Sequence, residues 1–143
     1  MTHQKQLPTS ADARMHQVSP DVLMHLLGGM MMARCIFCAA RFHLATLVQH
    51  GPKSLHELAQ ASGTYAPSLY RILRALASIG MFEEVMPATF AQTDLSSLLL
   101  PGVPGSMYEI ALMWDADYQW NSWGAIEVAL ITGTCAFEHV YQT

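Results

Sequence analysis

An almost uncharged apolar segment constrains this chain more than any other feature. The residues from 22 to 37 contain one Arg and one His, and their apolar side chains would surround the axis of a helix. A helix that is apolar all round is covered on more than one side. In a chain of 143 residues the simplest second cover is another copy of the chain, so the segment predicts a homodimer. The interface residues that we predict are Leu23, Leu27, Met30, Met31 and Phe37.

The composition agrees with a partly covered surface. Apolar residues make up 52% of the chain and charged residues 13%, which is about half the usual charged share. All seven Lys and Arg residues precede Ala75, whereas eight of the eleven acidic residues follow it. A C-terminal half without Lys or Arg is poorly suited to bind nucleic-acid phosphates. We therefore expect no nucleic-acid partner.

The cysteines and the N-terminus favour a cytoplasmic protein. Three cysteines are few and odd in number, which is typical of a reducing compartment. Cys35 and Cys38 form a C-x-x-C inside the apolar helix, where we expect buried packing thiols. The polar first residues lack a targeting pattern, and charged residues and histidines interrupt the long apolar run. We expect neither a membrane span nor a metal site.

The order of the predicted elements is that of a winged helix. Ser54 and Glu57 form an S-x-x-E capping box at a helix start, and Leu69, Leu73 and Leu76 have helical spacing. The pattern then changes to that of a β-hairpin. The expected elements are helices over 19–41, 42–49, 54–61 and 68–79, a hairpin over 81–85 and 90–93, and helices over 94–100, 106–114 and 120–131. The fold class is mainly α, a winged helix-turn-helix with a small hairpin wing and additional dimerisation helices.

Three segments are expected along the chain. Residues 1–18 would be a disordered or loosely packed arm, and residues 19–100 the dimerisation helix and the winged helix. Residues 101–143 would be a helical extension that leads toward a catalytic domain. Asp115 and Asp117 are expected in a solvated turn that caps the next helix.

Several stretches resemble the N-terminal domain of S-adenosylmethionine (SAM)-dependent O-methyltransferases of the caffeate and hydroxyindole type, especially bacterial ones. They lie in the expected order and cover nearly all of residues 20–141. The matching stretches are APSLYRILRALASIG (66–80), LPGVPGS (100–106), ALMW (111–114), Trp123-Gly124, Thr132-Gly133 and AFEHVY (136–141).

The resemblance implies an intertwined homodimer and a role in substrate binding. In that family the domain forms one wall of the acceptor pocket, and Met113 and Trp114 match positions that line it. Trp123 and Phe137 match nearby aromatic positions. Since Trp offers a large flat surface at low entropy cost, a flat aromatic acceptor is expected.

The chain departs from the family at its C-terminus. Relatives bind SAM in a Rossmann-like domain, whose Gly-rich loop and catalytic His have no counterpart up to Thr143. We therefore expect no cofactor, no catalytic residue and no methyl transfer by this chain alone. The predicted function is that of a dimerisation and acceptor-capping domain, truncated from a SAM-dependent O-methyltransferase. Whether a separate SAM-binding chain completes the enzyme is left open.

Two alternatives remain open. The first is a stand-alone dimeric protein that binds a small molecule. The second is a winged-helix DNA-binding regulator, because Arg71 and Arg74 lie on the helix that would read DNA. The wing over residues 85–90 has no positive charge, and the two arginines are expected to pack or to pair with Glu83 or Glu84.

Overall fold

The computed structural model of the chain describes residues 19–142. The contacts within it define two compact units, Met1–Met31 and Met32–Thr143, and each unit is described by itself. Helix α3 (Gly29–Arg41) begins in the first unit and continues in the second. The arm predicted over residues 1–18 lies outside the described residues.

The first unit contains helix α2 (Pro20–Leu27) and the first residues of α3. Ser19 caps α2 as predicted, since its Oγ accepts a hydrogen bond from the Asp21 N–H at 3.2 Å. The single helix predicted over 19–41 is interrupted at Gly28, whose N–H donates to the Met24 carbonyl at 3.0 Å. The physical reason is the Gly28-Gly29 pair, because each Gly costs about 1 kcal/mol in a helix interior.

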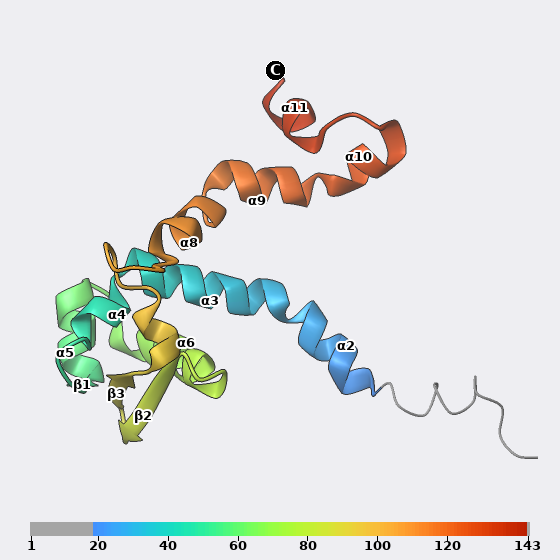
Figure 1. The fold of residues 1–143 in the computed structure, drawn as a ribbon. Helices are drawn as coiled ribbons and strands as arrows, with labels where there is room; N and C mark the ends of the chain where they lie inside the picture. Colours follow the sequence, from blue (N-terminus) through green and yellow to red (C-terminus); the bar gives the residue numbers. More distant parts are fainter. Residues whose placement is uncertain (1–18, 143) are drawn as a thin grey trace, which may run out of the picture. The chain divides into compact units, whose positions relative to one another are not determined.

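The second unit contains the predicted winged helix (Figure 1). Its elements are α4 (Leu44–Leu47), β1 (Lys53–Ser54), α5 (Leu55–Ser62), α6 (Ala66–Ser78), β2 (Phe82–Met86) and β3 (Thr89–Gln92). The strands form an antiparallel sheet in the order β1-β3-β2. Strand β1 has two residues, too few to form a periodic pattern in the sequence. The helix predicted over 42–49 is shortened to α4, because His43 adopts a left-handed conformation with φ 53°.

Hydrogen bonds to Glu84 connect the wing to α6. A register irregularity lies between Glu84 and Met86, just before the turn that joins the strands. The Glu84 Oε1 atom accepts hydrogen bonds from the Ala88 N–H at 2.8 Å and from the Tyr70 hydroxyl at 3.0 Å. One carboxylate thus holds both the turn and the helix.

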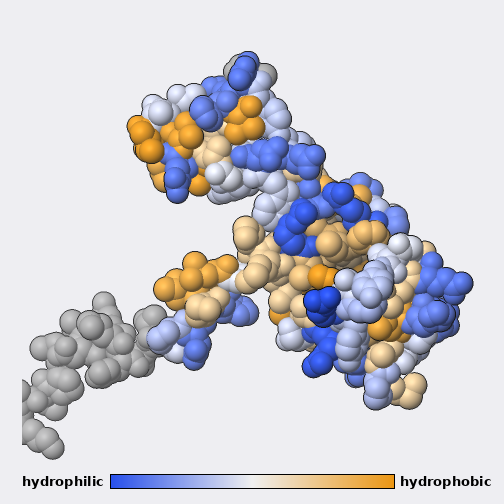
Figure 2. Space-filling model, turned by 180° about the vertical axis from the view of Figure 1, so that it is seen from behind, coloured by the Kyte–Doolittle hydropathy of each residue, from blue (hydrophilic) through white to orange (hydrophobic). Residues whose placement is uncertain are grey.

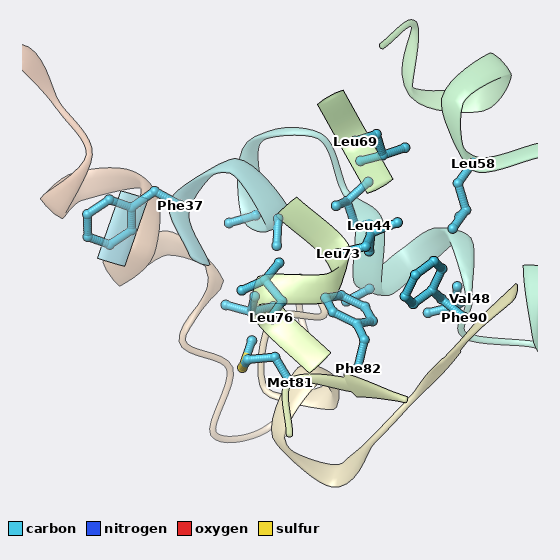
Figure 3. Close-up of a cluster of buried hydrophobic side chains, with 14 of the residues drawn as sticks. Phe37, Leu44, Val48, Leu58, Leu69, Leu73, Leu76, Met81, Phe82 and Phe90 are labelled. Atoms are coloured by element: carbon cyan, nitrogen blue, oxygen red, sulfur yellow. The ribbon is translucent and has the colours of Figure 1, made fainter. Parts of the chain in front are cut away.

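The hydrophobic core lies between the helices and the sheet of the second unit (Figure 3). Helix α6 buries Leu69, Leu73 and Leu76, which share one face at helical spacing. Phe82 and Phe90 enter from the hairpin and are almost completely buried. The core also includes Phe37, Leu44, Val48, Leu58 and Met81.

The C-terminal part of the second unit is helical. Thr93 caps α7, since its Oγ1 accepts a hydrogen bond from the Ser96 N–H at 3.3 Å. The helix predicted over 120–131 is divided at Ala125, directly after Gly124, a residue of low helix propensity. The elements are α7 (Asp94–Ser97), α8 (Tyr108–Trp114), α9 (Asp117–Gly124), α10 (Ile126–Thr132) and α11 (Ala136–Tyr141).

Candidate interface and acceptor wall

Seven large apolar side chains are exposed in the first unit, on α2 and the first residues of α3. Their exposed fractions lie between 54% and 69%, and apolar colour gathers on this stretch beside the grey residues in Figure 2. We call this set the α2–α3 face, and it consists of Val22, Leu23, Met24, Leu26, Leu27, Met30 and Met31. An exposed contiguous apolar surface is typical of an interaction site.

Four of the five predicted interface residues belong to the α2–α3 face, namely Leu23, Leu27, Met30 and Met31. Phe37 does not. It is only 8% exposed and lies in the core of the second unit, where its ring meets Trp120 edge-on with centroids 6.2 Å apart. Phe37 therefore leaves little surface for a partner chain.

Among the described residues, no single helix is long and apolar enough to cross a membrane. Helices α2 and α3 meet the length and composition requirement only when taken together as a bent pair.

The predicted acceptor residues lie on three helices of the second unit. Met113 and Trp114 stand at the end of α8 and are 45% and 58% exposed. Trp123 lies on α9 with 68% of its surface exposed, and Phe137 lies on α11 with 41% exposed. Large aromatic and thioether side chains with this exposure can contact a flat ligand or a protein partner.

Helices α9 and α11 are neighbours. Asn121 of α9 donates a hydrogen bond to the Tyr141 hydroxyl of α11 at 3.1 Å, and the rings of Phe137 and Tyr141 lie 4.9 Å apart. Trp114 and Trp123 take no part in the ring contacts of residues 19–142. The second unit therefore presents the four residues as exposed surface rather than as a closed pocket.

A shallow cavity of about 320 Å³ lies elsewhere, between α4, β1 and α5. Its lining includes Leu47, Lys53 and Leu58 and contains none of the four predicted acceptor residues.

Asp115 differs from the prediction of a solvated turn. Its side chain is 4% exposed, and its two carboxylate oxygens pair with different arginines of α3. Oδ1 pairs with Arg34 Nη1, and Oδ2 lies 2.5 Å from Arg41 Nη2. This pairing makes the burial possible, since a buried charge needs a partner of opposite charge.

Trp120 completes the arrangement around Asp115. The Arg34 guanidinium lies 4.9 Å from the centre of the Trp120 ring, a cation–π distance. We call Arg34, Phe37, Arg41, Asp115 and Trp120 the Asp115 cluster. Sequence reasoning missed it, although one signal was present. Two arginines seven residues apart share one face of an otherwise apolar helix, which indicates a common acidic partner.

The arginines of α6 are placed for packing. Arg74 Nε lies 3.9 Å from Glu84 Oε2, and its guanidinium lies 5.8 Å from the centre of the Tyr70 ring. The pairing predicted with Glu83 or Glu84 is thus confirmed for Arg74. The Nε of Arg71 donates to the Pro67 carbonyl of its own helix at 3.4 Å.

The cysteines are free thiols. Cys35 and Cys38 are half-buried, less than predicted, and Cys135 is exposed. Burial raises the pKa of the Cys35 thiol, and the neighbouring Cys38 raises it further. A raised thiol pKa lowers the fraction of reactive thiolate. Within residues 19–142, no three His, Cys, Asp or Glu side chains are grouped so that they could hold a metal ion.

The fold and the exposed helices define the class to which the chain belongs. A family model, the O-methyltransferase dimerisation domain, matches residues 24–102, which is more than half of the chain. The chain is therefore a member of the O-methyltransferase dimerisation-domain family, as the resemblance in the sequence implied.

Individual relatives agree with this assignment. Phenazine O-methyltransferase PhzM of Lysobacter antibioticus is 37% identical over 123 residues, which are 86% of this chain and 36% of that protein. The solved structure of LaPhzM has a TM-score of 0.82, with 36% identity over 86% of this chain and 37% of that chain. The SAH-bound structure of CalO1, a methyltransferase in calicheamicin biosynthesis, has a TM-score of 0.74, with 29% identity over 85% and 36%. The chain thus spans a little over a third of the length of these relatives.

The described residues do not fit the cofactor that the family implies. A SAM site of the Rossmann type needs a Gly-rich loop between a parallel strand and the N-terminus of a helix. The sheet within residues 19–142 is antiparallel. Glycines such as Gly63 and Gly133 follow the last residue of a helix and have positive φ angles. These residues therefore contain no loop of the kind that such a site needs.

Proposed function

We propose that this chain is the dimerisation and acceptor-capping part of a SAM-dependent O-methyltransferase, and that it works as a homodimer. The observation that carries the proposal is the α2–α3 face, whose seven apolar side chains are each more than half exposed. Membership of a dimerisation-domain family supports a second copy of the chain as the partner that covers this face.

The acceptor is a flat aromatic compound with a hydroxyl group, and the end of α8 forms part of its wall. Met113 and Trp114 supply exposed apolar and aromatic surface side by side on the last turn of this helix. Trp123 of α9 and Phe137 of α11 add further exposed aromatic surface. The phenazine O-methyltransferase among the relatives supports a fused aromatic ring system as the acceptor.

The methyl donor is SAM, which residues outside this domain bind. Support comes from CalO1, whose structure was solved in an SAH-bound form. We place the reaction in the cytoplasm, where free thiols such as Cys35, Cys38 and Cys135 remain reduced.

The interface is tested with two matched methionine variants. Met30 on the α2–α3 face is 63% exposed, and Met86 at the end of β2 is 62% exposed. Met30→Glu places a charge in the proposed interface, so we expect sedimentation velocity to show a shift from dimer toward monomer. Met86→Glu should leave the mass unchanged. Equal behaviour of the two variants would contradict the α2–α3 interface.

The acceptor wall is tested by calorimetric titration with 1-hydroxyphenazine, a flat aromatic compound that carries a hydroxyl group. Trp114→Ala removes a large contact surface, so its affinity should fall severalfold relative to the unmodified chain. Tyr65→Ala is the control, because Tyr65 is another highly exposed aromatic residue and is not a predicted acceptor contact. Equal affinities of both variants and the unmodified chain would contradict the assignment of Trp114.

A further inference from the structure

The Asp115 cluster joins three helices of the second unit. Asp115 follows the last residue of α8, the two arginines lie on α3, and Trp120 lies on α9. Arg34 and Arg41 are two helical turns apart, and Phe37 lies between them on the same face of α3. One face of α3 therefore contacts both Asp115 and Trp120.

Asp115 is unusual in its burial. Within the described part of the chain, the buried polar or charged side chains are Ser96 and Asp115, and only Asp115 carries a charge. Only the acid is buried, because the Arg34 and Arg41 side chains are 51% and 58% exposed. The Asp115 carboxylate loses its water, and its charge is compensated by the two arginines. What this pairing contributes is a fixed orientation of the side chain, since each carboxylate oxygen must face one particular donor.

The orientation of Asp115 also constrains the residues of the predicted acceptor wall. Met113 and Trp114 immediately precede Asp115, and the Asp115 N–H donates to the Ala111 carbonyl at 3.1 Å. Since the Asp115 backbone belongs to the last turn of α8, the pairing of its side chain with two residues of α3 ties this turn, which carries both wall residues, to α3. Trp120 is held by contacts with Phe37 and Arg34, and its buried indole Nε1 has no hydrogen-bond partner within residues 19–142.

We propose that Asp115 is a positioning residue, which holds the last turn of α8, and with it Met113 and Trp114, in one orientation against α3. It acts through Arg34 and Arg41. The importance of this orientation for substrate binding rests on the proposed function, whereas the orientation itself is independent of that function.

The proposal is tested by fluorine NMR of the full chain labelled with 5-fluorotryptophan. The three tryptophans, Trp114, Trp120 and Trp123, give three resonances, which single Trp→Phe variants assign. Asp115→Asn keeps the size of the side chain and removes its charge. We expect the resonances of Trp114 and Trp120 to shift or broaden, whereas that of Trp123 stays in place.

Asp117→Asn is the matched control. It makes the same change two residues away, in the exposed first turn of α9, and should leave all three resonances unchanged. A folded Asp115→Asn variant with an unchanged Trp114 resonance would overturn the proposal. Movement of all three resonances to the positions of the unfolded chain would also overturn it, since Asp115 would then serve the fold alone.

A second pair of variants tests the orientation without removing the buried acid. Arg41→Gln breaks one of the two pairs at an arginine whose side chain is 58% exposed, so the fold should survive. We expect the Trp114 resonance to shift in Arg41→Gln and to return toward its original position in Arg41→Lys, which keeps the charge. The same spectrum for both variants would contradict the role of the ion pair.

Titration with 1-hydroxyphenazine separates this inference from the proposed function. We expect Asp115→Asn to weaken binding severalfold while Asp117→Asn does not. If Asp115→Asn moves the Trp114 resonance but leaves the affinity unchanged, the positioning role stands and the acceptor wall is wrong. If Trp114→Ala weakens binding but Asp115→Asn does not move the resonance, the wall stands and the positioning role is wrong.

Discussion

Ser54 illustrates how a single residue fixes the start of a helix. Its Oγ accepts a hydrogen bond from the Glu57 N–H at 3.3 Å, and the Glu57 carboxylate accepts one from the Ser54 N–H at 2.8 Å. Ser54→Ala removes the first of these bonds and should lower the free energy of unfolding by about 1 kcal/mol. Urea denaturation at a fixed protein concentration measures the loss. Ser54→Thr keeps the hydroxyl and should lose clearly less, so equal losses would contradict the cap.

Glu57 predicts a pH dependence at the same helix start. Hydrogen bonds from the Ser54 side chain and backbone lower the pKa of the Glu57 carboxyl in the folded chain. In the unfolded chain the carboxyl has its ordinary, higher pKa. Because the folded pKa is the lower one, the stabilisation is present above the unfolded pKa and is lost as the pH falls through the folded pKa.

Denaturation of the unmodified chain and of Glu57→Gln over a series of pH values measures this effect. The difference in stability between the two should be largest near neutral pH and should shrink in acid. The same comparison in the Ser54→Ala background should show a weaker pH dependence. A stability difference that grows on acidification would show that the sign is wrong.

At the scale of elements, α6 is held by its buried face. Leu73 is completely buried among Leu69, Leu76 and the hairpin phenylalanines. Leu73→Ala leaves a cavity and should lower the free energy of unfolding by about 2–5 kcal/mol. Denaturant titration measures this cost. Leu130→Ala is the control, because Leu130 is 81% exposed, and a comparable loss there would contradict the assigned core.

The sequence predicts most elements but not where helices break. The capping box of α5, the apolar face of α6 and the hairpin are local patterns, and the structure has all three. The Gly28-Gly29 pair allows a kink or a close backbone approach, and the sequence does not decide between them. The break at Ala125 is not predicted, because Gly124 is a single residue of low helix propensity within an otherwise helical pattern. Periodicity reports which side of a helix is apolar and is insensitive to a single interrupted turn.

Contacts between distant residues were harder to predict. Asp115 was interpreted from its neighbours as part of a solvated turn, whereas Arg34, one of its two partners, lies 81 residues earlier. A local pattern cannot contain such a pair, because only the tertiary fold brings α3 to the end of α8. By contrast, the exposure of Leu23, Leu27, Met30 and Met31 agrees with a helix that is too apolar for its own chain to cover.

At the scale of the whole molecule, the account depends on a second copy of the chain covering the α2–α3 face. The most direct test is the solution mass, measured by light scattering during serial dilution into the low micromolar range. We predict twice the mass of one chain throughout this range, and a shift toward the mass of one chain for Met30→Glu. A well-folded monomer of the unmodified chain at all concentrations would contradict the central claim, because seven exposed apolar side chains would then have no partner copy.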